Sequence, residues 1–314
     1  MPEPVFLIFE LIVYLLLALC LRHALARRRA LELLAGVLYG LLLEVATIIQ
    51  LQGYHYGRFL IMFDQVPLCI GVGWGVILYS VMATSDAWNV LPVQRPFADA
   101  LLAWNIDLSM DAVAIRLGFW TWAFDGRWFG VPLANFFAWY VVVASFSASV
   151  RLLRAWQDRR GLRWLYPFAA VVPSLFVLLS LDRLYVSYAY QPYDLQWLIF
   201  GGQLLLGLVA LWTSRRSLRR PQTVDWSVAS VPLVFHLLYT GALLWAGFHR
   251  QIPALLVISL IMLILGLALH LAPLAPARLP LRGNIDADQD ERAARGGGPG
   301  DSLAQDDVSQ EARA

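Results

Sequence analysis

The feature that most constrains the fold is a series of apolar runs. Each run has roughly the length of a transmembrane helix. A helix of about 20 mostly apolar residues spans the hydrocarbon core of a bilayer. The runs predict an all-α fold, a polytopic bundle of about nine transmembrane helices. They lie near residues 4–21, 31–51, 60–83, 97–117, 131–150, 164–181, 195–212, 227–247 and 252–274.

The composition agrees with an integral membrane protein and excludes several other classes. Of the 314 residues, 59% are hydrophobic and 15% are charged, whereas a soluble domain has about 25% charged residues. We therefore expect a multi-pass protein of the cell (plasma) membrane. The net charge of +2 predicts no nucleic-acid partner. Cys20 and Cys69 lie in apolar segments without metal or redox spacing, which indicates packing roles.

Arginine residues predict the orientation of the bundle, because they gather in alternate loops. Cytoplasmic loops of membrane proteins carry an excess of basic residues. This places the N-terminus outside and the C-terminus in the cytoplasm. The three arginine-rich clusters follow the first, fifth and seventh runs, and consist of Arg22, Arg27, Arg28 and Arg29, then Arg151, Arg154, Arg159, Arg160 and Arg163, then Arg215, Arg216, Arg219 and Arg220.

Two parts of the chain are expected, a polytopic domain over residues 1–275 and a disordered cytoplasmic tail over 276–314. The tail contains a glycine-rich stretch at 296–300 and many polar residues, a composition that cannot bury a core. Residues 24–26 resemble a signal-peptide cleavage site. However, the leading segment has Glu3 and no positive charge, so the first run is predicted to be a retained helix.

Two acids interrupt the fourth run and indicate a functional site. Asp107 and Asp111 are spaced i, i+4 and so share one helix face. A charged carboxylate at bilayer depth costs roughly 2.5–3.5 kcal/mol on insertion scales. Intramembrane acids are therefore functional candidates by default.

Two further acids could join them. Glu44 lies past the middle of the second run and Asp64 near the start of the third. With the topology above, Glu44 and Asp111 fall at a similar depth, roughly 5 Å to the outer side of the midplane. We expect the four acids to face one cavity. The alternative is that each is a separately satisfied interior group, hydrogen-bonded to Ser, Thr or the backbone.

An aromatic cluster follows the fourth run, at residues 119–124 and 128–129, and includes Trp120, Trp122 and Trp128. Two interpretations remain open. Tryptophan gathers at membrane interfaces regardless of function. Alternatively, some of these rings line the cavity and stabilise a cation through their π-faces.

Between about residues 40 and 140 the chain contains a set of motifs around these acids and aromatic residues. They are Glu44, the Gly53-Tyr54-His55-Tyr56-Gly57 turn, Pro67 with Gly71-Val72-Gly73-Trp74, the Asn105-to-Trp122 segment, residues 128–132 and Asn135-Phe136-Phe137-Ala138-Trp139. Together these motifs resemble a known family of membrane proteins of carotenoid biosynthesis, which includes carotenoid 1,2-hydratases.

The resemblance implies addition of water across the terminal double bond of an acyclic carotenoid end, such as that of γ-carotene or a bacterioruberin precursor, without a cofactor. A lipid-soluble carotenoid would be the substrate, and other carotenoid biosynthesis enzymes are possible partners. Hydration needs a proton delivered to carbon and a group that holds water. We expect Asp111 to donate the proton and Asp107 or Glu44 to hold the water. The candidate catalytic residues are Asp111, Asp107, Glu44 and Asp64, and the candidate substrate-binding residues are Trp120, Trp122, Trp128, Tyr54 and Asn135.

Two other functions use intramembrane acids. A membrane prenyltransferase would hold magnesium on two acid-rich motifs, and Asp107-x-x-x-Asp111 resembles the first of them, but the later runs contain no second Asp-x-x-x-Asp. A proton-coupled transporter would use the acids as a relay. Inverted repeats would support that function, and none is found in the sequence.

Overall fold

The computed structural model describes residues 3–124, 126–157, 164–190, 194–219, 221 and 223–271. Over these residues the fold is all-α, as expected, and each of the nine apolar runs overlaps one long helix. The predicted tail at 276–314 lies outside the described residues. The helices are α1 (Pro4–Ala26), α2 (Ala30–Leu51), α3 (Leu68–Ala87), α4 (Arg95–Ala114), α5 (Leu133–Gln157), α6 (Tyr166–Ala169), α7 (Val171–Tyr188), α8 (Gln196–Ser214), α9 (Trp226–Trp245), α10 (Phe248–Gln251) and α11 (Pro253–His270).

Eight helices of the described chain are long and apolar enough to cross a membrane, and α4 is not among them. The reason lies in its position. The neighbours of α4 are α3, α5, α8, α9 and α11, and most of its side chains are buried. A helix enclosed by other helices does not need an apolar outer surface, so α4 tolerates the acids that lower its hydropathy.

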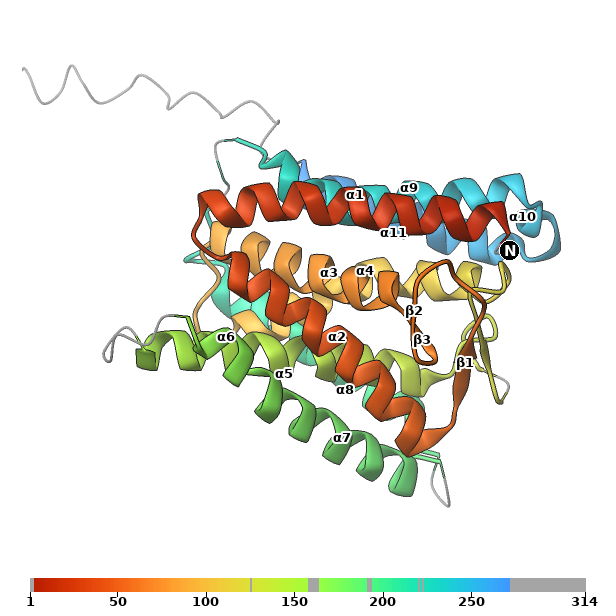
Figure 1. The fold of residues 1–314 in the computed structure, drawn as a ribbon, viewed down its shortest axis with the longest axis horizontal. Helices are drawn as coiled ribbons and strands as arrows, with labels where there is room; N and C mark the ends of the chain where they lie inside the picture. The colour runs from red at the N-terminus through yellow and green to blue at the C-terminus, as the bar shows by residue number, and fades with distance from the viewer. Residues whose placement is uncertain are drawn as a thin grey trace, which may run out of the picture. The chain divides into compact units, whose positions relative to one another are not determined.

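Two short antiparallel pairs of strands lie at one end of the bundle. Strand β1 (Tyr54–Tyr56) pairs with β4 (Trp120–Trp122), so that Tyr54 faces Trp122. Strand β2 (Met62–Phe63) pairs with β3 (Val66–Pro67). The β1–β4 pair, called the ribbon below, joins the loop after α2 to the loop after α4. The end of the bundle that carries it is called the ribbon end (Figure 1).

The expected start of the third helix was wrong. Residues 60–67 belong to the third apolar run, but they form β2, β3 and the turn between them, and α3 begins at Leu68. Asp64 lies in that turn with φ +54°, a left-handed conformation that aspartate tolerates better than most residues. Pro67 is the N-cap residue of α3 and has an extended backbone, with φ −65° and ψ 133°, so the helix begins directly after it.

Helices α2 and α3 approach each other closely because glycines face the contact. A Cβ atom on Gly40 would lie 2.5 Å from Cβ of Trp74 and 2.8 Å from the carbonyl oxygen of Gly71. One on Gly75 would lie 2.4 Å from Cγ2 of Val37. Small residues spaced four apart let two transmembrane helices pack backbone to backbone. This contact brings Trp74 of α3 beside the second half of α2.

The opposite end of the bundle, called the arginine end below, is tied by ion pairs among four helices. Asp86 at the end of α3 pairs with Arg29, Arg95 and Arg151, which lie just before α2, at the start of α4 and near the end of α5. Arg151 also contacts the fully buried Asp99 at 3.0 Å. Both carboxylates therefore have a cationic partner, which is the condition under which a buried charge is tolerated.

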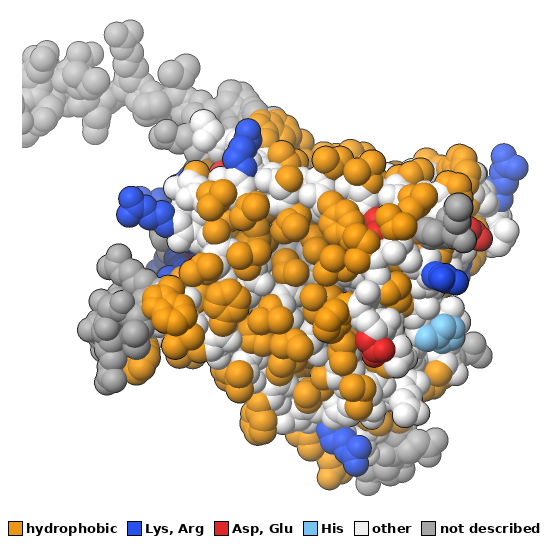
Figure 2. All heavy atoms as spheres, in the orientation of Figure 1, with side chains coloured by type: hydrophobic (Ala, Val, Ile, Leu, Met, Phe, Trp, Pro, Cys, Tyr) orange, Lys and Arg blue, Asp and Glu red, His pale blue; other side chains and the backbone are white. Residues whose placement is uncertain are grey.

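The surface agrees with a bilayer environment. In the face drawn in Figure 2, hydrophobic side chains cover most of the area and arginine side chains lie toward the margins. Large apolar side chains with high exposure include Phe176 at 71%, Leu198 at 72% and Ile264 at 62%. These belong to α7, α8 and α11. Such a broad apolar exterior is typical of a surface that lipid covers.

Candidate active site

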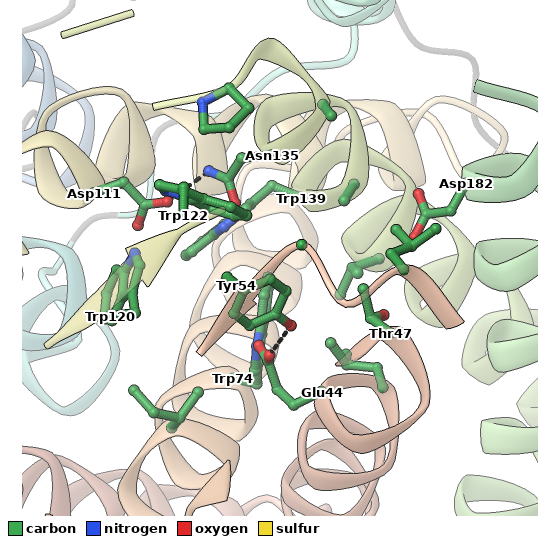
Figure 3. A pocket seen from close by; sticks show the side chains of 18 of the residues that line it. Glu44, Thr47, Tyr54, Trp74, Asp111, Trp120, Trp122, Asn135, Trp139 and Asp182 are labelled. Carbon is green, nitrogen blue, oxygen red and sulfur yellow. Dashed lines mark hydrogen bonds between the residues drawn. The ribbon is translucent and has the colours of Figure 1, made fainter. Parts of the chain in front are cut away.

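A large cavity lies in the half of the bundle nearest the ribbon end. Its volume is about 570 Å³, within the usual range for small-molecule sites. Its walls come from α1, α2, α3, α4, α5, α7 and α9, and from the ribbon. Three carboxyl groups line it, those of Glu44, Asp111 and Asp182. Figure 3 shows them converging on one space from three different helices.

Glu44 is held by two donors that come from separate elements. The indole Nε1 of Trp74 donates to Oε1 at 2.7 Å, and the hydroxyl of Tyr54 donates to Oε2. Trp74 is placed by the close packing of α2 on α3, and Tyr54 by the ribbon. Both hydrogen bonds end on the carboxyl oxygens, so they fix the orientation of the Glu44 side chain toward the cavity.

Tyr54 is a persistent donor in this contact. Burial, first, and then the charge of Glu44 raise the pKa of Tyr54 well above its usual value. The phenol therefore keeps its proton in neutral and alkaline solution, and Glu44 keeps its hydrogen bond.

Asp107 and Asp111 form a pair that shares one amide. Nδ2 of Asn135 donates to Oδ2 of Asp111 at 2.6 Å and to Oδ2 of Asp107 at 3.2 Å. Both acids are almost fully buried, and Oδ1 of each has no hydrogen-bond partner among the described residues. Two carboxyl groups this close cannot both ionise without strong repulsion. The arrangement therefore suits a pair that holds one proton, with Asp111 as the member that lines the cavity.

Aromatic rings form much of the remaining wall. The Trp74 and Trp139 rings are 4.3 Å apart between centroids, and those of Tyr54 and Trp122 are 5.0 Å apart. Trp120 and Phe124 also line the cavity. Phe124 and Val186 are 53% and 45% exposed. These two lining residues therefore also form part of the molecular surface.

The structure brings together most, but not all, of the residues expected at the site. Glu44, Asp111, Tyr54, Trp120, Trp122 and Asn135 line the cavity, and Asp107 adjoins it through Asn135. Two of the expected residues lie elsewhere. Asp64 is exposed in the β2–β3 turn, outside the cavity. Trp128 does not line it, because its indole donates to the carbonyl of Leu108 at 2.8 Å and holds the loop against α4.

Asp182 was missed, because the sixth apolar run was taken to end at residue 181. Helix α7 continues to Tyr188, so Asp182 is an interior residue of an apolar helix. It is 4% exposed, and its Oδ2 has no hydrogen-bond partner in the described part of the chain. The signal that identified Glu44, an acid within an apolar helix, would have found Asp182 as well. Trp74 and Trp139 also line the cavity. From the sequence they were named only within motifs and were not predicted as site residues.

The fold and this site define a multi-pass membrane protein whose bundle encloses an apolar, aromatic cavity lined by acids. A family model described as carotenoid biosynthesis protein matches residues 3–189. That range is more than half of the chain and covers every cavity-lining acid. The chain belongs to the carotenoid biosynthesis protein family. No curated protein and no solved structure matches the sequence.

Proposed function

We propose that the protein hydrates the terminal carbon–carbon double bond of an acyclic carotenoid end. The observation that carries this proposal is the presence of two differently held carboxyl sites on one apolar cavity. The Asp107–Asp111 pair is bridged by one amide, whereas Glu44 accepts hydrogen bonds from Trp74 and Tyr54. Hydration of an alkene needs a proton donor, and a negative group near the resulting cation stabilises it.

Asp111 is the proposed acid. It lines the cavity, and its Oδ1 accepts no hydrogen bond from the described residues. Transfer of its proton to the less substituted alkene carbon forms a C–H bond and leaves a tertiary cation at the neighbouring carbon. The proton shared with Asp107 is available because ionisation of both buried acids is unfavourable. Positioned acid–base groups of this kind contribute about 10²–10⁴-fold to a rate.

Glu44 and the aromatic wall are proposed to stabilise the cation and complete the reaction. The faces of Trp120, Trp122 and Trp139 can interact with a carbocation as they do with other cations, and the Glu44 carboxylate supplies opposite charge in a low-dielectric site. Water then forms a C–O bond to the cation and loses a proton to Glu44. Return of that proton to the Asp107–Asp111 pair restores the site, so one water is added and nothing else is consumed.

The direct test is to express the chain in a host that makes an acyclic carotenoid such as lycopene or γ-carotene. The expected product contains one additional water per reacting end, and the oxygen is labelled when the cells grow in heavy-oxygen water. Mass spectrometry measures both. Unchanged pigment with several acyclic substrates would contradict the proposal. A gain of a five-carbon unit that is lost on magnesium chelation would favour a prenyltransferase instead.

A further inference from the structure

A polar seam runs between α2 and α7 beside the cavity and is not used by the acid–base steps above. It consists of Gln50 on α2 and of Asp182 and Tyr185 on α7. Gln50 joins the two helices, because its Nε2 donates to the carbonyl of Leu179 at 3.0 Å. Asp182 and Tyr185 are three residues apart, so they share one face of α7, and both line the cavity.

Each of these side chains has a buried polar atom without a hydrogen-bond partner among the described residues. They are Oε1 of Gln50, Oδ2 of Asp182 and the hydroxyl of Tyr185. Asp182 and Tyr185 are each only 4% exposed. A buried polar group without a hydrogen bond is costly, and such groups are normally paired with protein or water. The groups of Asp182 and Tyr185 lie about one helical turn apart on one cavity wall, which suits a shared polar ligand. Gln50 contacts α7 one turn earlier, at Leu179.

The chemistry of the three groups suits water. A carboxyl oxygen and an amide oxygen accept hydrogen bonds, while a phenol both donates and accepts. Buried water typically makes about three hydrogen bonds to such groups. An apolar polyene, in contrast, could satisfy none of them. The seam also lies on the Glu44 side of the cavity, since Thr47, one turn beyond Glu44 on α2, lines the wall near it.

The relative placement of the acids is compatible with water bound at the seam. In Figure 3, Asp111 and Asp182 lie on opposite sides of the cavity, with Glu44 and Tyr54 between them. A substrate end held between Asp111 and Glu44 would therefore have the acid on one side and the seam on the other. The seam approaches the ribbon end, where α2 ends at Leu51 and α7 at Tyr188.

We propose that Gln50, Asp182 and Tyr185 bind and deliver the water that is added to the substrate, with Asp182 as the main positioning residue. This inference rests on the proposed hydration. If water is delivered through the seam, weakening the seam should not prevent protonation by Asp111. The tertiary cation would still form, but it would more often lose a proton and return to an alkene than capture water.

This partition can be measured with full-length protein reconstituted in lipid vesicles with lycopene in heavy water. Each cation that forms takes up one deuteron. It then gives either a hydrated product or, after loss of a proton, a deuterated alkene. For Asp182→Leu we expect the ratio of deuterated alkene to hydrated product to rise about tenfold, the effect of losing one hydrogen bond to a charged group. Asp182→Asn, which still binds water, should raise it much less.

Tyr185→Phe provides a second test with little risk to folding. It removes only the unpartnered hydroxyl and keeps the ring, which stacks on Phe137 at 4.4 Å between centroids. We expect a smaller rise in the same ratio. Phe176→Leu is the matched control, because Phe176 lies on the same helix and is 71% exposed. Its ratio should equal that of the wild type.

The outcomes separate the two proposals. A wild-type protein that neither hydrates nor exchanges deuterium refutes the proposed function itself. A wild-type protein that hydrates, combined with unchanged ratios in Asp182→Leu and Tyr185→Phe, refutes the seam alone. If Asp182→Leu does not accumulate, the double variant Tyr185→Phe with Gln50→Met takes its place. An unchanged ratio of deuterated alkene to hydrated product in that variant would refute the seam. A fall in exchange and hydration by the same factor would indicate a purely structural role and would also refute the seam.

Discussion

At the scale of single residues, the cavity distinguishes three carboxyl groups by what holds them. Glu44 accepts from two donors, Asp111 shares an amide with Asp107, and Asp182 has an oxygen that no described residue contacts through a hydrogen bond. Identical functional groups in different surroundings take different protonation states and roles. In the proposed mechanism, Asp and Glu side chains alone therefore serve as the acid, the base and the group that positions water.

Asp111→Asn separates catalysis from folding. The amide keeps the shape and most of the hydrogen bonding of the acid but cannot donate its proton. We expect normal accumulation in the membrane and a loss of hydration of about 10²–10⁴-fold, measured as hydrated carotenoid per unit of protein. Asp64→Asn is the control, since Asp64 is exposed outside the cavity, and it should retain full activity. Full activity in well-accumulated Asp111→Asn would eliminate Asp111 as the donor.

Tyr54→Phe tests how Glu44 is held. It removes the hydroxyl that donates to Oε2 and leaves Trp74 as the donor to Oε1. A hydrogen bond to a charged group contributes about 1.5–3 kcal/mol, so we expect hydration to fall by roughly tenfold or more. The neighbouring His55 is exposed on the other face of the ribbon, and His55→Phe should change the rate little. Equal rates in all three proteins would argue against a role for Tyr54.

At the scale of elements, the site depends on contacts that bring distant parts of the chain together. The ribbon pairs residues 54–56 with 120–122, and without it Tyr54 would not reach Glu44. The α2–α3 contact sets the position of Trp74 in the same way. Both contacts need a close approach of backbones, and at the α2–α3 contact side chains would obstruct it, which explains the small residues at Gly40, Gly71 and Gly75.

Gly40→Ala tests the α2–α3 contact. Its Cβ would lie 2.5 Å from Cβ of Trp74, an atom fixed to the backbone, so the helices must separate. We expect a loss of stability of about 1–3 kcal/mol, seen as a lower thermal midpoint in detergent, together with reduced hydration because Trp74 moves. A Cβ atom added to Gly241 on α9 would meet no described atom within 4 Å. Gly241→Ala should keep or raise the midpoint, and a similar fall in both variants would refute the packing argument.

The bounds of the helices show which parts of the fold could be predicted from the sequence and which could not. Hydropathy placed α2 at 31–51, and the structure has it at Ala30–Leu51, because burial in lipid depends on local composition. Hydropathy wrongly predicted helix at 60–67, where the chain forms β2 and β3. The reason is that apolarity alone does not distinguish a strand from a helix. Hydropathy also ended the sixth run at residue 181, so Asp182 was not recognised as an acid within a helix. The ribbon could not be predicted, because its register depends on pairing between remote segments.

At the scale of the whole molecule, the charges divide between the two ends of the bundle. Successive long helices run in opposite directions, which places Arg29, Arg95 and Arg151 at the arginine end, with Arg58 and the ribbon at the other. The acid-lined cavity lies in the half of the bundle nearest the arginine-poor ribbon end. Because cytoplasmic segments are richer in arginine, we propose that the ribbon end faces outward and that the arginine end faces the cytoplasm.

Labelling of single introduced cysteines tests this orientation. The two native cysteines, Cys20 and Cys69, are fully buried and should give no background. Asp64→Cys places an exposed thiol at the ribbon end and Arg216→Cys places one beyond α8, at the arginine end. With a membrane-impermeant maleimide on intact spheroplasts, we expect Asp64→Cys to be labelled and Arg216→Cys to remain unlabelled until the membrane is permeabilised. The positive-inside argument fails if the pattern is reversed, and the antiparallel arrangement fails if both sites are labelled from the same side.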